Sequence, residues 1–515
     1  MSELSHQKNY VTVGLIAIHM AVAIPLAYHL NIWSDEASTL YTTNNGLISA
    51  IHGALDNERQ APLYFAVLGL WRNVNHSIFF ARLFSVGCSV LAVKLFADLV
   101  FRHFERRTAI CAAVFFALHP FLFWSSLEIR TYSLVILLSV QLVNIFLRAF
   151  PAVDVQIDTG RKRSRSWFLI VAIISLYTNY YLGFILVGLF GTLVYRRQWR
   201  PAGAYLAFMS LAGFAFIPLA IVVAKQVAAN TGGFQGDRTM SEGLRTLWHH
   251  TLTFILPAEV MPDQNTSPAA VLRLNIARVA AILISITVCF RWRRLSGQTI
   301  SFGISAIIVG GLFLCAYLLL GENYVEIRHA SVLFVPLILA LSSGLSDLFS
   351  SDDLLYPRLS TWMLAACSFV ILCFFAYSVF TLYPEMKKRG DWESVANYIE
   401  TRESAGQPIL VFTTYDALAL KVYYRGINSV LPDRNYFDFD LEDKASSEKS
   451  LSKRIDFAIS EIPADSTQIW LLESEKCMTT EACEPLENFV EANYTVIQQQ
   501  DFYRERVRLL KRKTQ

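Results

Sequence analysis

Residues 10–30 read YVTVGLIAIHMAVAIPLAYHL, and the chain continues directly into NIWSDEASTL over residues 31–40. The first stretch contains no Lys, Arg, Asp or Glu, and it is long enough to cross a hydrocarbon core about 30 Å thick as an α-helix. A single lysine precedes it and no small-residue cleavage pattern follows, so we expect an uncleaved membrane anchor. The second stretch therefore brings two carboxylates, Asp35 and Glu36, to the membrane surface.

The composition extends the membrane assignment to most of the chain. Of the 515 residues 54% are hydrophobic and 17% charged, and the mean hydropathy is +0.38, whereas soluble proteins have about 25% charged residues. Residues 1–383 hold 27 Lys and Arg and 19 Asp and Glu, against 18 and 23 in the much shorter segment 384–515. We expect a polytopic α-helical membrane domain over 1–383 and a water-soluble α/β domain over 384–515.

Apolar runs predict about eleven transmembrane helices. They cover 10–30, 78–101, 108–125, 131–149, 167–179, 181–195, 203–224, 272–290, 300–320, 329–347 and 361–383. The fifth and sixth can also be read as one long helix plus a re-entrant piece. The connections near residues 102–107, 148–165, 196–200 and 291–294 are rich in Lys and Arg, which favours a cytoplasmic location for them and for the N-terminus. In the inner membrane of a bacterium, the loops 31–77 and 225–271 and the C-terminal domain would then be periplasmic.

The C-terminal domain has strand-like runs at 408–413, 468–472 and 494–497 and helical stretches near 391–404 and 416–425, which indicates an α/β layer structure. It has no Gly-rich phosphate loop and no nucleophile elbow, so we assign it no chemistry. Its two cysteines, Cys477 and Cys483, are close enough in sequence for a disulfide in an oxidising compartment. The basic tail Lys511–Lys513 is too short for a nucleic-acid surface, and we interpret it as a frayed end.

Ionisable residues gather at the predicted external ends of the helices. Asp35 and Glu36 are either a solvated acidic helix start or catalytic carboxylates. Glu128 and Arg130, between the third and fourth spans, are either a structural ion pair or a site in which Arg130 binds a phosphate. Arg328 opens the tenth span against the positive-inside trend, so it either snorkels to lipid phosphate or faces a bound anion.

Two weaker groups complete the candidates. His249, His250 and Asp263 could ligate a metal, but adjacent histidines rarely share one ion, so we predict no metal centre and leave a divalent cation open as a cofactor. Asn179 and Tyr180, with the tyrosine that follows them, are either ligand contacts or an interfacial aromatic belt.

An ordered set of short motifs carries a family resemblance. It consists of Asp35-Glu36, Ala61-Pro62-Leu-Tyr64, Arg82 in FARLFS, His119-Pro120, Glu128-Ile-Arg130-Thr-Tyr132-Ser-Leu and Tyr177-Thr-Asn-Tyr180-Tyr181. This set resembles the GT-C membrane glycosyltransferases of the protein-mannosyltransferase and aminoarabinose-transferase superfamily. The resemblance covers residues 10–200, and later spans agree in hydropathy alone.

The resemblance implies a glycosyltransferase that moves a sugar from a polyprenyl-phosphate donor to a cell-envelope lipid, glycan or protein, inverting the anomeric centre. It implies a base at Asp35, with Glu36 beside it, and a donor-phosphate contact from Arg130. We add Arg328, from its place at a span start, and Arg59, which can substitute in charge for the basic residue of relatives, as further candidate phosphate contacts. Substrate contacts would come from Glu128, Tyr132, Tyr64, Asn179, Tyr180 and His329. Two positions depart from the pattern: Gln60-Ala61-Pro62 stands where relatives often have His or Lys beside a Pro-Pro pair, and Asn179 stands where some have His.

Two other functions fit parts of the pattern. A transporter or lipid-linked-sugar flippase also needs membrane charges, but it predicts ionisable residues at mid-span and internal symmetry, which the sequence lacks. A non-catalytic envelope assembly protein would act through its C-terminal domain and would tolerate replacement of Asp35.

Overall fold

The structure is a computed structural model. It describes residues 2–151, 159–230, 239–255, 292–321, 325–349, 390–412, 416–433, 455–474, 477 and 483–513, and scattered positions within 272–282 and 369–379. The chain divides into two compact units. The first comprises Met1–Ala27, Gln60–Ala224 and Gly236–Leu382, and the second comprises Tyr28–Arg59, Lys225–Gln235 and Tyr383–Gln515. The C-terminal segment therefore shares a unit with the loop that follows the first predicted span.

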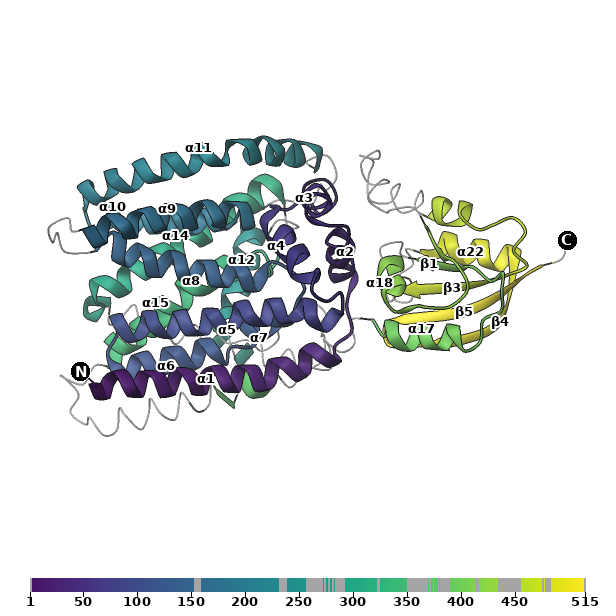
Figure 1. Ribbon diagram of the computed structural model, residues 1–515, viewed down its shortest axis with the longest axis horizontal. Coiled ribbons are helices and arrows are strands. Elements are labelled where there is room, and N and C mark those ends of the chain that lie inside the picture. The colour runs from purple at the N-terminus through teal and green to yellow at the C-terminus, as the bar shows by residue number, and fades with distance from the viewer. Residues whose placement is uncertain are drawn as a thin grey trace. The chain divides into compact units, whose positions relative to one another are not determined.

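The first unit is helical (Figure 1). Its helices are α1 (Ser2–His29), α4 (Leu63–Arg72), α5 (Ile78–His103), α6 (Arg106–Ala117), α7 (Pro120–Leu127), α8 (Tyr132–Ala149), α9 (Thr159–Thr178), α10 (Leu182–Tyr195), α11 (Trp199–Asn230), α12 (Met240–Ile255), α14 (Gly297–Leu320) and α15 (Ser331–Phe349). Local sequence sets several of these ends. Ser77 caps α5 by accepting a hydrogen bond from the backbone of Phe80, and Ser296 caps α14 in the same way through Thr299.

The predicted count of eleven spans is not established by the described residues. They contain five helices long and apolar enough to cross a bilayer, within α1, α5, α8, α11 and α14, and one bent pair that passes the same criterion together. Shorter apolar helices, α10 among them, also occur. The predicted spans 272–290 and 361–383 lie mostly outside the described residues. Residues 167–195 form two helices, α9 and α10, separated at Asn179–Tyr181.

The predicted span 108–125 is a broken helix. The chain leaves helical geometry at Leu118 and His119, and α7 begins at Pro120, bent by 42° from α6. Proline cannot donate the backbone hydrogen bond that a continuous helix needs, but it is well suited to a first helical turn. His119 takes over as the cap, because its Nδ1 accepts a hydrogen bond from the Phe121 amide.

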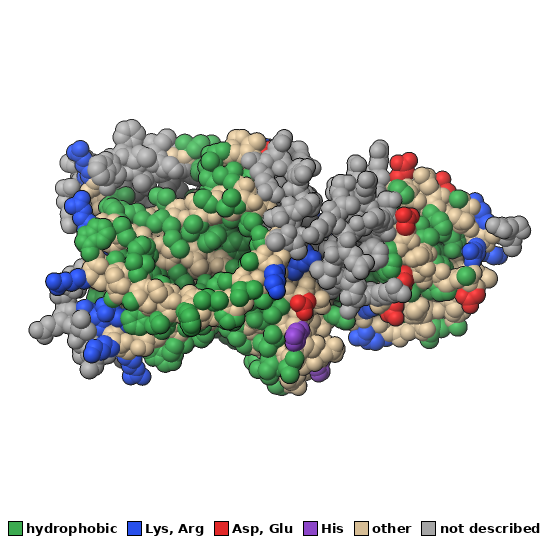
Figure 2. All heavy atoms as spheres, turned by 90° about the horizontal axis from the view of Figure 1, so that it is seen from above, with side chains coloured by type: hydrophobic (Ala, Val, Ile, Leu, Met, Phe, Trp, Pro, Cys, Tyr) green, Lys and Arg blue, Asp and Glu red, His purple; other side chains and the backbone are tan. Residues whose placement is uncertain are grey.

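The surface of this unit matches a lipid environment. Figure 2 shows hydrophobic side chains over a broad area of it, with Lys and Arg gathered at one end. On α11, the side chains of Leu211, Phe214 and Ile221 are exposed although they are large and apolar. A helix of this length with an apolar exposed face fits contact with lipid rather than with water.

The second unit contains a five-stranded sheet in the order β2-β1-β3-β5-β4. The strands are β1 (Ile409–Phe412), β2 (Val430–Leu431), β3 (Gln468–Ser474), β4 (Tyr494–Asp501) and β5 (Glu505–Arg512). The first three are parallel, and β5 and β4 add to the sheet in antiparallel pairing. The predicted strand runs thus correspond to β1, β3 and β4.

Helices cover both faces of the sheet. On one face, α22 (Glu484–Asn493) packs Leu486 and Val490 into a core with Ile469 and Leu471 of β3. On the other face lies α17 (Trp392–Glu400), the expected helix near 391–404. Its Tyr398 ring contacts Trp470 of β3 edge-on, with 6.1 Å between centroids. Alternation along β3 thus sends successive side chains to opposite helical layers, as the pleat requires.

The interpretation of Lys511–Lys513 as a frayed end is wrong. Lys511 is opposite Gln468 in the pairing of β5 with β3, and the Lys513 amide donates to the Asn493 carbonyl at 2.9 Å. These backbone bonds order the chain almost to its end, because an antiparallel partner is available on each side of β5. Near the same sheet, Cys477 and Cys483 are joined by a disulfide with 5.1 Å between their Cα atoms.

Candidate active site

Asp35 and Glu36 lie in the first turn of α2 (Ser34–Thr42), in the second unit. Their environments differ. The Glu36 side chain is 2% exposed, and its Oε2 accepts a hydrogen bond from the Trp33 amide at 3.3 Å. This is the reciprocal half of a capping box, so Glu36 has a structural task at the helix start. Asp35, on the same turn, is half-buried.

The segment before α2 is fixed by contacts with the C-terminal part of the same unit. The Asn31 Nδ2 donates to the Gly390 carbonyl at 3.1 Å, and the Ile32 amide donates to the Tyr423 hydroxyl at 2.9 Å. The Ser34 hydroxyl donates to Asp416 Oδ1 at 2.9 Å instead of capping its own helix. Trp33, rather than Ser34, occupies the N-cap position of α2.

Glu58 is hydrogen-bonded to one face of α2. Its Oε1 accepts hydrogen bonds from the hydroxyls of Ser38, at 2.7 Å, and Thr42, at 3.4 Å. The next residue, Arg59, has a φ of +52°, a left-handed conformation uncommon for a side chain of this size. Such backbone conformations concentrate at functional sites, which is consistent with the predicted phosphate contact of Arg59. No local pattern in the sequence predicts that Glu58 accepts hydrogen bonds from Ser38 and Thr42.

Glu128, Arg130 and Tyr132 lie in the first unit, at the turn between α7 and α8. Glu128 is 1% and Arg130 6% exposed. The turn is fixed by buried hydroxyls: Ser85 donates to the Glu128 carbonyl at 2.6 Å. The Tyr132 ring stacks on Trp124, with 5.1 Å between centroids. Ionisable side chains are rarely buried in a membrane domain without a partner or a function.

A second cluster in the first unit combines two segments that are distant in sequence. Tyr181, in the turn between α9 and α10, stacks on the ring of His329 with 5.5 Å between centroids. In the same turn, Asn179 Oδ1 accepts a hydrogen bond from the Tyr181 amide at 3.0 Å. The buried hydroxyl of Tyr180 has no hydrogen-bond partner among the described residues. The predicted candidates Asn179, Tyr180 and His329 thus belong to one neighbourhood.

Arg328 has a protein partner. Its Nε lies 2.5 Å from Glu326 Oε2, and its side chain is 21% exposed. An anion bound at Arg328 would have to share the guanidinium with Glu326.

Two further buried arginines were not assigned a role from the sequence. Arg72, the last residue of α4, is 4% exposed, and Arg82, in the first turn of α5, is 1% exposed. Arg82 Nη1 donates to the Ala27 carbonyl near the end of α1 at 3.3 Å. Tyr64, also on α4, is fully buried and packs edge-on against Phe65. The sequence does carry a signal for Arg72 and Arg82, because each is a cation within an apolar run near a predicted external helix end.

Three buried histidines form hydrogen bonds within the first unit. His119 Nε2 lies 3.1 Å from the Phe254 carbonyl, and His19 is hydrogen-bonded to Ala117 and Ser89. His250 Nε2 lies 2.5 Å from the Val325 carbonyl. Among the described residues no group of three or more potential ligands is placed to hold a metal ion, and Asp263 lies outside them.

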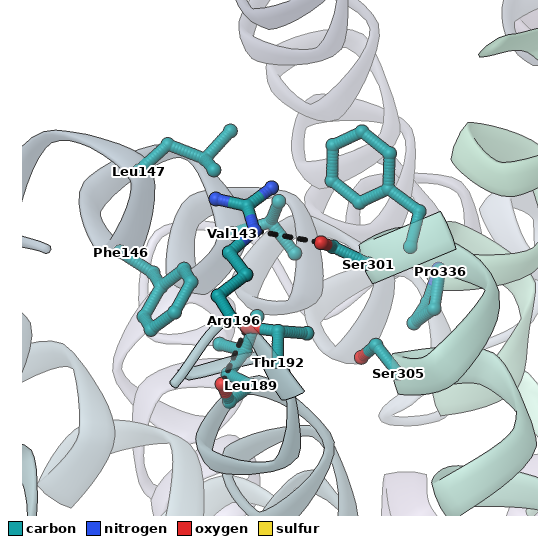
Figure 3. Close-up of a pocket in the computed structure, with 10 residues that line it drawn as sticks. Val143, Phe146, Leu147, Leu189, Thr192, Arg196, Ser301, Ser305 and Pro336 are labelled. Atoms are coloured by element: carbon teal, nitrogen blue, oxygen red, sulfur yellow. Dashed lines mark hydrogen bonds between the residues drawn. The ribbon is translucent and has the colours of Figure 1, made fainter. Parts of the chain in front are cut away.

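A pocket lies elsewhere in the first unit (Figure 3). It is lined by Val143, Phe146, Leu147, Leu189, Thr192, Arg196, Ser301, Phe302, Ser305 and Pro336. Arg196 donates from Nε to the Ser301 hydroxyl at 2.7 Å, as the dashed line shows. None of the predicted site residues lines this pocket, and its basic residue belongs to the predicted cytoplasmic set. We therefore do not assign it to the reaction.

The predicted site is divided between the two units. Asp35, Glu36 and Arg59 belong to the second unit, and Tyr64, Glu128, Arg130, Tyr132, Asn179, Tyr180, Arg328 and His329 belong to the first. Joint action of Asp35 and Arg130 remains a prediction from the sequence.

Comparison with known proteins identifies the fold. The chain is similar to the crystal structure of ArnT from Cupriavidus metallidurans in the apo state, with a TM-score of 0.56 and 13% identity over 96% of this chain and 98% of that one. The crystal structure of ArnT bound to undecaprenyl phosphate gives a TM-score of 0.55 at 13% identity, over 96% and 97%. No family model and no curated protein matches the sequence. The fold is that of the GT-C membrane glycosyltransferases, so the predicted resemblance is confirmed at the level of the fold.

Proposed function

We propose that the protein is a membrane glycosyltransferase that moves a sugar from a polyprenyl-phosphate donor to a cell-envelope acceptor. The observation that carries this proposal is the half-buried Asp35 in the first turn of α2, directly after the first membrane helix of a GT-C fold. The solved relative ArnT binds undecaprenyl phosphate, which supports a lipid phosphate as the donor's carrier here.

The reaction is a single displacement with inversion. The acceptor hydroxyl oxygen forms a bond to the anomeric carbon as the bond from that carbon to the phosphate oxygen breaks. Asp35 takes the hydroxyl proton, and the lipid phosphate leaves with the bonding electron pair. Arg130 is the proposed phosphate contact, because a guanidinium buried in a medium of low dielectric stabilises charge that builds on a leaving oxygen.

The activity assay requires the full chain in lipid vesicles. Purified protein is mixed with a panel of polyprenyl-phosphate sugars and an extract of envelope lipids and glycans, and products are identified by mass spectrometry. We expect one donor to be consumed, with stoichiometric release of polyprenyl phosphate. Donor translocation without a new glycosidic bond would instead identify a flippase and contradict the proposal.

The proposed topology places the N-terminus in the cytoplasm and the C-terminal domain outside it, in the periplasm of a bacterium. The basic end of the first unit supports this orientation. A reporter that is active only in the periplasm, fused after Gln515, should give signal. Signal from a reporter that is active only in the cytoplasm would reverse the orientation.

A further inference from the structure

α18 (Asp416–Tyr423), in the C-terminal part of the second unit, contacts the segment that leads into α2. Asp416 accepts a hydrogen bond from the Ser34 hydroxyl at 2.9 Å, and the Tyr423 hydroxyl accepts one from the Ile32 amide at 2.9 Å. The two acceptors are seven residues apart, so they lie on one face of the helix, two turns from each other. The two ends of α18 therefore bind Ile32 and Ser34, two of the four residues that precede Asp35.

The anchoring is partly buried and has a second support. Asp416 is 8% exposed, and its hydrogen bond from Ser34 is partly shielded from water, which strengthens it relative to the same contact on a surface. The Asn31 side chain donates to the Gly390 carbonyl at 3.1 Å, one residue before Asp391, whose amide donates to Glu505 Oε2 at 2.9 Å. Residues 31, 32 and 34 are thus all held by segments more than 350 positions away in sequence.

We propose that Asp416 is a positioning residue for Asp35, and that the C-terminal domain holds the start of α2 in the orientation that the reaction needs. Ser34 is the residue directly before Asp35, so a change in the Ser34 contact shifts the carboxylate on the next position of the same turn. Rates depend steeply on such placement, since a displacement of about 1 Å can cost about 10²-fold. The inference rests on the proposed function for its kinetic part only.

The test uses the full chain in lipid vesicles and two independent measurements. Hydrogen exchange of residues 34–42 reports whether the helix is held, whether or not the protein is active. Turnover and donor KM report whether that anchoring serves the reaction. In Asp416→Ala we expect faster exchange in α2 and a turnover about 10- to 100-fold lower, with donor KM changed less than about twofold.

Matched variants separate positioning from general damage. Asp416→Asn retains an oxygen that accepts from Ser34, so it should recover most of the turnover. The double variant Ser34→Ala/Asp416→Ala should be no worse than the more severe single variant, since both remove the same contact. The control is Asp433→Asn, because Asp433 pairs with Lys421 of the same helix but is 84% exposed and does not contact α2 through that pair.

Each outcome decides the proposal. Unchanged exchange in α2 of Asp416→Ala would overturn the anchoring. Faster exchange with parental turnover would show that the anchoring does not serve catalysis. Should Asp416→Ala not fold, Tyr423→Phe, which retains packing but loses the acceptor for Ile32, takes its place with the same expectations. A parental protein that transfers no sugar from any donor refutes the proposed function, while the exchange measurement still decides the contact.

Discussion

The start of α2 and the turn between α7 and α8 both present ionisable side chains, but they are stabilised in opposite ways. Asp35 is half-buried, and two residues just before it, Ile32 and Ser34, donate hydrogen bonds to α18, which is distant in sequence. Arg130 is buried in a turn packed within the helical unit and fixed by neighbouring hydroxyls and rings. Under the proposed function, the half-buried carboxylate would take the proton of the acceptor and the buried guanidinium would hold the donor phosphate.

The largest expected effect comes from Asp35. Asp35→Asn preserves the shape of the side chain but removes most of its basicity, so turnover should fall by about 10²–10⁴-fold with little change in donor affinity. Glu36→Gln is the matched variant, since the amide oxygen can still accept from the Trp33 amide, and its turnover should remain close to parental. Single-turnover rates on folded protein measure both. A large loss of turnover in Glu36→Gln together with parental turnover in Asp35→Asn would identify Glu36 as the base.

Arg130 should affect binding as well as turnover. Arg130→Ala removes a phosphate contact that exists before the reaction and strengthens during it, so we expect turnover lower by about 10²-fold and weaker donor binding. Arg130→Lys should recover only part of both, because a point charge replaces a planar fork that binds two oxygens. Titration with labelled polyprenyl phosphate measures the binding. Unchanged donor affinity in Arg130→Ala would place the phosphate elsewhere, and Arg72 and Arg82 would be the next residues to test.

A smaller effect is expected from pH, in the second unit. Burial raises the pKa of Glu505 to about 8 from its ordinary 4.5; the Asp391 amide opposes the shift, and the charges of Asp416 and Asp391 add to it. The folded protein therefore retains this proton between about pH 4.5 and pH 8, while the unfolded chain has lost it. The free energy of unfolding should decrease as pH rises through that window, by at most about 1.4 kcal/mol per pH unit.

Glu505→Gln should flatten this decrease, because an amide does not titrate. The measurement is the Tm of the transition of the second unit, recorded for the full chain from pH 5 to pH 9. Asp501→Asn is the control, since Asp501 is 60% exposed in its ion pair with Arg506. An equal slope in parental protein and Glu505→Gln would show that Glu505 is charged throughout the range.

The sequence predicts elements whose side chains repeat a strong local pattern. Long apolar runs identify α1, α5, α8, α11 and α14, because the cost of exposing backbone groups to lipid leaves a helix as the only solution. Continuous apolar runs likewise indicate β1 and β3. The sequence analysis predicts no strand at β5, ERVRLLKR, because charged residues interrupt its apolar positions and its strand geometry depends on pairing with β3 and β4.

The site residues divide in the same way, into those that a local sequence pattern predicts and those that only the folded chain brings together. Local sequence by itself determined that Asp35 and Glu36 follow a membrane helix and that Arg130 lies between two others, because chain order and apolar length set those places. It did not distinguish the capping Glu36 from the half-buried Asp35, a difference made by burial. Only the tertiary structure decided that Ser34 meets Asp416, 382 residues away, and that residues 28–59 share a unit with the C-terminal sheet. Such contacts depend on the folded path of the whole chain, and no local pattern of charge or hydropathy encodes them.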